Sequence, residues 1–72
     1  MNNNKYLKCL SDNLKDLMGE MSVSDLSEKV NIPQPTLSRY ILCKRQISLD
    51  NLIKLADYFN IDIDVLIGRR EF

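Results

Sequence analysis

Apolar residues recur at three- and four-residue steps along almost the whole of this 72-residue chain. The first run is Leu7, Leu10, Leu14 and Leu17, a spacing that places all four side chains on one face of a helix. No segment shows the alternation of apolar and polar residues that is typical of a half-buried strand. The periodicity therefore predicts an all-α fold.

Residues with known capping preferences divide this pattern into short helices. Gly19 is expected to end the first helix, and Ser22 to begin the second. Asp25, three residues after Ser22, can complete a variant of the capping box and suits the positive end of the helix dipole. Asn31 is expected to end the second helix, because asparagine tolerates the left-handed conformation better than other non-glycine residues.

Two prolines mark the start of a third helix, residues 33–42. The first backbone N–H groups of a helix have no partner within it, so Pro33 and Pro35 forfeit no hydrogen bond there. Three apolar residues are expected to form the inward stripe of this helix: Leu37, Tyr40 and Ile41.

A fourth helix is expected to begin at Ser48, with Asp50 in its first turn. Its buried side is expected to consist of Leu49, Leu52, Ile53, Ala56 and Phe59. The stretch 60–62 closes this helix and opens a last one, which ends at Gly68 and leaves residues 69–72 as a tail. We therefore expect residues 1–72 to form one domain of five short helices.

The side-chain inventory argues against catalysis and against a metal site. The chain has no histidine, the commonest general base and a frequent zinc ligand. Cys9 and Cys43 are far apart and form no metal-ligand spacing, so two reduced thiols are expected. Gly19 and Gly68 are isolated and form no phosphate-binding loop. We expect no enzyme, no metal and no cofactor.

No apolar run approaches the ~20 residues that a membrane-spanning helix needs. Residues 1–10 lack the apolar centre of a signal peptide. We therefore expect a cytoplasmic protein that does not associate with membranes.

Charge is distributed unevenly, although the basic and the acidic residues each total ten. Residues 29–49 contain no acid, and their basic residues are Lys29, Arg39, Lys44 and Arg45. Acids dominate the segments on either side. Lys and Arg bind phosphates with release of counterions, and Gln and Arg can bind base edges. The basic segment begins at a tight turn between two short helices, which favours DNA binding over the alternative of a merely solvated loop.

Residues 22–67 resemble the phage repressor and Cro type of helix-turn-helix domain, the XRE-like family. The matching positions are Leu26, Ile32, Thr36, Leu37, Ser38, Arg39, Tyr40, Lys44, Arg45, Ser48, Leu52, Ala56, Phe59, Ile61 and Leu66. The resemblance implies a compact five-helix lambda-repressor-like domain, in which helices two and three form the helix-turn-helix.

The resemblance also implies which residues meet double-stranded DNA. The positions that would contact bases are Gln34, Pro35, Ser38 and Arg39. Thr36 would lie near a phosphate, and Lys44 and Arg45 would bind the DNA backbone. For Ser38 and Thr36 the alternative is a plain surface position.

Several positions depart from the family pattern. Val23 replaces a glutamine that often contacts phosphate, and Asn31 and Cys43 stand where turn glycines are frequent. Cys43 is expected to make its loop less regular. Ile41 occupies the position of a glutamate that pairs with an arginine of helix one, near Asp16 here, and we expect apolar packing to replace that pair.

The leading hypothesis is a sequence-specific transcriptional regulator, a Cro-like repressor or a controller, that inserts helix 33–42 into the major groove of a palindromic operator. A homodimer would span two half-sites ~34 Å apart. Its interface candidates are Ile63, Ile67 and Phe72, for which core packing plus a loose tail is the alternative. No small-molecule ligand is expected. The second hypothesis is a protein-interaction module that does not bind DNA, which the neutral net charge and Val23 favour.

Overall fold

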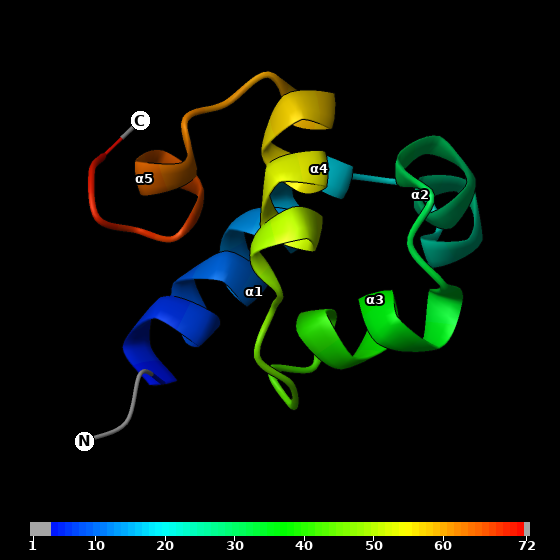
Figure 1. Ribbon diagram of the computed structural model, residues 1–72, viewed down its shortest axis with the longest axis horizontal. Helices are drawn as coiled ribbons and strands as arrows, with labels where there is room; N and C mark the ends of the chain where they lie inside the picture. The colour runs from blue at the N-terminus through cyan, green and yellow to red at the C-terminus, as the bar shows by residue number, and fades with distance from the viewer. Residues whose placement is uncertain (1–3, 72) are drawn as a thin grey trace.

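The computed structural model describes residues 4–71, and within that range it contains five helices and no strand. They are α1 (Asn4–Met18), α2 (Val23–Val30), α3 (Gln34–Ile41), α4 (Leu49–Phe59) and α5 (Ile63–Leu66). α1 packs against α3 and α5, and α2 and α5 both pack against α4. Figure 1 shows α5 and α3 on opposite sides of α4. The prediction of an all-α, five-helix fold is confirmed.

All five helices and the turn before α3 contribute to the hydrophobic core. The buried apolar residues are Leu10, Leu14, Leu26, Val30, Ile32, Leu37, Tyr40, Leu55, Ala56, Val65 and Leu66. Full burial of one such leucine contributes about 1.5–3 kcal/mol relative to exposure. Because each helix supplies at least two of these side chains, the position of α3 depends on the whole core.

The face of α4 that packs on the core differs from the predicted one. Leu49 is 68% exposed and Ile53 is 40% exposed, so the prediction that both are buried was wrong. Leu55, which the predicted stripe omitted, is fully buried, and Leu52 and Phe59 pack partly against the core. Two sets of residues on α4 satisfy helical spacing, and contacts with the rest of the chain select the set that contains Leu55.

The helix ends follow local sequence signals. The Ser22 hydroxyl accepts a hydrogen bond from the Asp25 N–H at 3.0 Å, and the Ser48 hydroxyl accepts one from the Asn51 N–H at 3.2 Å. Both predicted N-caps are therefore confirmed. Each helix is followed by a residue with positive φ: Gly19 (56°), Asn31 (59°), Cys43 (61°), Asn60 (55°) and Gly68 (85°). Single left-handed residues thus end all five helices.

Candidate nucleic-acid interface

The turn between α2 and α3 sets how α3 reaches the surface. Asn31 has φ 59°, and its N–H donates to the Ser27 carbonyl at 2.9 Å. The Ser27 hydroxyl donates to the Ile32 carbonyl at 2.6 Å, so a side chain also closes the turn. Pro33 is the N-cap of α3 and Pro35 lies in its first turn. The helix occupies residues 34–41, one residue shorter at each end than predicted.

The predicted base-contacting residues lie on the accessible side of α3. Leu37 and Tyr40 are buried, and Ile41 packs partly against the core. Of the predicted site residues, Gln34, Pro35 and Arg39 are exposed, and Thr36 and Ser38 are half-buried. Lys44 and Arg45 are exposed in the loop that follows. The residues predicted to contact DNA are thus brought to one helix and the next loop, and their contact with DNA stays a prediction.

The basic loop, residues 42–48, begins at a regular helix end. The Lys44 N–H donates to the Arg39 carbonyl at 2.8 Å and the Cys43 N–H donates to the Tyr40 carbonyl at 3.0 Å, the two bonds of a Schellman motif. The expectation that Cys43 disturbs this loop was wrong, because Cys43 adopts the left-handed conformation with φ 61°. A side chain in that conformation costs roughly 1–2 kcal/mol. The motif places Lys44 directly beside the end of α3.

The basic residues of α3 and its loop carry no compensating carboxylate. Within residues 4–71 the ion pairs are Lys8–Asp12, Arg69–Asp64 and Arg70–Asp62. Arg39, Lys44 and Arg45 take part in none of these. Because their charges are neutralised by no neighbouring acid of the described residues, all three are available to bind phosphate or a base edge.

A buried serine links α1 to the end of α3. Ser11 is only 2% exposed, and its hydroxyl donates to the Ile41 carbonyl at 2.5 Å. A hydrogen bond therefore joins α1 to α3 in addition to the apolar packing that was expected at Ile41. Asp16 is exposed and takes no part. The sequence held a signal that was missed, because Ser11 is a polar residue within the otherwise apolar stripe of α1.

Two side chains of α4 contact the helix-turn-helix. The Asn51 amide donates to the Tyr40 hydroxyl at 2.9 Å, and the Lys54 ammonium donates to the Asn31 carbonyl at 3.2 Å. Asn51 and Lys54 had no predicted role. Neither contact could be found from periodicity, because each joins α4 to a residue outside that helix, Tyr40 in α3 and Asn31 in the turn after α2.

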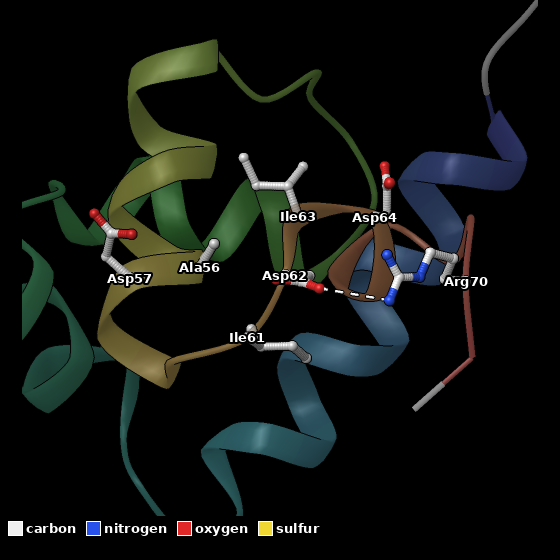
Figure 2. A pocket seen from close by; sticks show the side chains of 7 residues that line it. All are labelled: Ala56, Asp57, Ile61, Asp62, Ile63, Asp64 and Arg70. Carbon is white, nitrogen blue, oxygen red and sulfur yellow. Dashed lines mark ion pairs between the residues drawn. The ribbon is translucent and has the colours of Figure 1, made fainter.

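A groove with a volume of about 400 Å³ lies between α4 and α5. Its lining residues are Ala56, Asp57, Ile61, Asp62, Ile63, Asp64 and Arg70. Figure 2 shows the Arg70 guanidinium beside Asp62, with 3.7 Å between the paired atoms. No group of three or more His, Cys, Asp or Glu side chains among residues 4–71 is arranged to hold a metal ion. The groove shares no lining residue with the basic loop.

Two further findings concern the thiols and the membrane. Cys9 and Cys43 are both free and half-buried. In the described part of the chain, the helices lack the combination of length and apolar character that crossing a membrane requires.

Comparison with known proteins adds one finding. A family model described as helix-turn-helix matches residues 14–66. The match extends from the second half of α1 to the end of α5, and it includes α2, α3 and the basic loop. No curated protein and no solved structure matches the chain.

Proposed function

Because the chain belongs to the XRE-like family of helix-turn-helix DNA-binding regulators, we propose that it is a Cro-like repressor or a controller protein of the cytoplasm. It inserts α3 into the major groove of a palindromic operator. The observation that carries the proposal is the group of exposed cations at the end of α3, Arg39, Lys44 and Arg45, which form no ion pair among residues 4–71.

The residues of α3 and of the loop have different tasks. Arg39 and Gln34 suit bidentate hydrogen bonds to guanine and adenine, and Pro35 suits contact with a thymine methyl group. Ser38 completes the base-contacting set, and Thr36 lies near a phosphate. Lys44 and Arg45 bind the DNA backbone, which sets the register of the protein on the duplex without selecting a sequence.

A homodimer supplies the second half-site of the operator. The predicted interface residues Ile63 and Ile67 are half-buried, and Phe72 lies outside the described residues. Exposed apolar residues on α4 extend this candidate interface. Leu49 and Ile53 follow one face of α4, and Ala56, one turn after Ile53, lines the same groove as Ile63. We propose that Leu49, Ile53 and Ile63 contact a second copy of the chain.

Fluorescence anisotropy with generic duplex DNA at several salt concentrations tests the proposal. Affinity should fall log-linearly with salt, and Lys44→Ala should make the slope less steep by about 1.8 for a dimer, because it removes one phosphate contact per protomer. When the salt concentration rises fourfold, the affinity of the wild type should therefore fall by a factor about twelve times larger than that of the variant. Lys8→Ala is the matched control, since it removes the same charge from α1, where Lys8 pairs with Asp12.

Arg39→Ala should behave differently from Lys44→Ala. Loss of a base contact costs about 1–3 kcal/mol and relaxes the sequence preference at one position. A slope that changes equally in Lys44→Ala and Lys8→Ala would contradict the assignment of the basic loop.

The second candidate function is a protein-interaction module that does not bind DNA. The exposure of Leu49 and Ile53, together with the neutral net charge, favours it. It predicts no wild-type binding to duplex DNA even at low salt, whereas the regulator hypothesis predicts binding that is strongest there.

A further inference from the structure

Asn51 of α4 contacts both sides of the basic loop. Its side-chain amide donates to the Tyr40 hydroxyl, before the loop, at 2.9 Å. Its backbone N–H donates to the Ser48 hydroxyl, at the end of the loop, at 3.2 Å. One residue thus closes the segment 40–48, which contains Lys44 and Arg45.

The burial of Tyr40 strengthens its hydrogen bond with Asn51. Tyr40 is 3% exposed, and its hydroxyl meets the half-buried Asn51 side chain, so water competes weakly for the bond. α3 packs mainly against α1 and α2, whereas α4 packs mainly against α2 and α5. Contacts between the backbones of α3 and α4 are therefore few, and a side-chain hydrogen bond has a large share in fixing one helix relative to the other.

The position of Tyr40 is coupled to the residues proposed to contact DNA. Arg39 precedes Tyr40 in the chain, and the Arg39 carbonyl accepts the hydrogen bond from the Lys44 N–H. A rotation of α3 at Tyr40 would therefore move the side chains of both Arg39 and Lys44. One turn after Asn51, Lys54 contacts the carbonyl of Asn31, the first residue of the segment 31–48 that contains α3 and the basic loop. α4 thus holds this segment at its start and at its end.

We propose that Asn51 is a positioning residue for DNA recognition, which fixes the orientation of α3 and of the basic loop through Tyr40 and Ser48. This inference rests on the proposed function. Base contacts require closer alignment than phosphate attraction does, because hydrogen bonds depend on angle and distance whereas the backbone charge acts over a longer range. Loss of the Asn51 contact therefore lowers the preference for the operator more than it lowers non-specific affinity.

The test compares operator DNA, selected from random duplexes with the wild-type protein, with a scrambled duplex. Asn51→Ala should lower the ratio of the two affinities on the order of tenfold, the equivalent of one base contact, and leave the salt slope unchanged. Tyr40→Phe keeps the buried ring and removes only the hydroxyl, so it should have a similar effect. The double variant should be no worse than either single variant, because all three lack the same bond.

Asn13→Ala is the matched control. Asn13 is also half-buried, and its amide donates to the Val65 and Leu66 carbonyls at 3.2 and 2.9 Å, which joins α1 to α5 rather than to α3. A merely structural role for Asn51 predicts that Asn13→Ala and Asn51→Ala change selectivity alike. Circular dichroism verifies that every variant is folded at the assay temperature.

The outcomes separate the two proposals. A selectivity loss in Asn51→Ala and Tyr40→Phe, but not in Asn13→Ala, supports the inference. Wild-type binding with unchanged selectivity in Asn51→Ala, or with equal losses in Asn13→Ala, would overturn this inference alone. Absence of DNA binding by the wild type would overturn the proposed function and this inference together.

Discussion

Replacing Leu55 with alanine should remove much of the stability of this domain, whereas the same replacement at Leu49 should have little effect. Both residues lie on α4, but Leu55 is fully buried and Leu49 is 68% exposed. Leu→Ala removes three carbons, worth about 0.8 kcal/mol each when fully buried, or about 2.4 kcal/mol at Leu55. The cavity left behind raises the expected cost to about 3–4 kcal/mol.

The expected loss of stability in Leu49→Ala is only about 0.8 kcal/mol, because about a third of the Leu49 side chain is removed from water and no enclosed cavity forms. Urea denaturation followed by circular dichroism measures both, with the difference taken from the midpoints at a common slope. Because the stability of a dimer rises with protein concentration, repeating the denaturation at two concentrations separates any contribution of Leu49 to a dimer from its contribution to the fold of one chain. A cost at Leu49 that equals or exceeds that at Leu55 at the lower concentration would refute the observed packing of α4.

Three further predictions concern local features and are tested by thermal denaturation. Ser11→Ala should cost about 1–3 kcal/mol, because it leaves the half-buried Ile41 carbonyl of α3 without its donor. Cys43→Gly should raise the free energy of unfolding by up to about 1 kcal/mol, because relief of the left-handed strain outweighs the cost of ordering a more flexible glycine. A loss of stability would show that the Cys43 side chain contributes more than its strain costs. Gly68→Ala should destabilise more than Gly19→Ala, because a Cβ at Gly68 would lie 2.7 Å from Cys9 atoms whereas one at Gly19 meets nothing within 4 Å; equal costs would contradict that close contact.

The start of α2, the end of α2 and the start of α4 could be predicted from the sequence, because each depends on a few neighbouring residues. Ser22 and Ser48 cap helices through bonds to residues three positions later, and Asn31 ends α2 through a bond four residues back. Such short-range hydrogen bonds depend on residue type and on spacing within one turn, so the sequence pattern is a direct guide to them.

The buried face of α4 could not be predicted in the same way. Leu49, Ile53 and Leu55 are all apolar, and spacing alone does not decide which of them meets the core. The decision depends on where α2 and α5 lie against α4, which involves residues distant in the chain. The prediction failed where the packing was not local.

The same distinction applies to the candidate site. The accessible positions of Gln34 and Arg39 followed from the apolar stripe of α3 and from family resemblance. The contacts that support α3 did not, because Ser11 lies 30 residues from Ile41 in sequence and Asn51 lies 11 residues from Tyr40. Contacts of this kind depend on the folded arrangement.

The five left-handed helix ends have a consequence for the rate at which the chain folds. Because each of the first four helices is ended by a single left-handed residue and joined to the next by a short connection, few conformations must be searched before neighbouring helices meet. Helical domains dominated by such local contacts fold within microseconds to milliseconds. We therefore expect a temperature-jump experiment to show a single relaxation on this timescale. A domain that refolds so quickly regains its DNA-binding surface within milliseconds of an unfolding event.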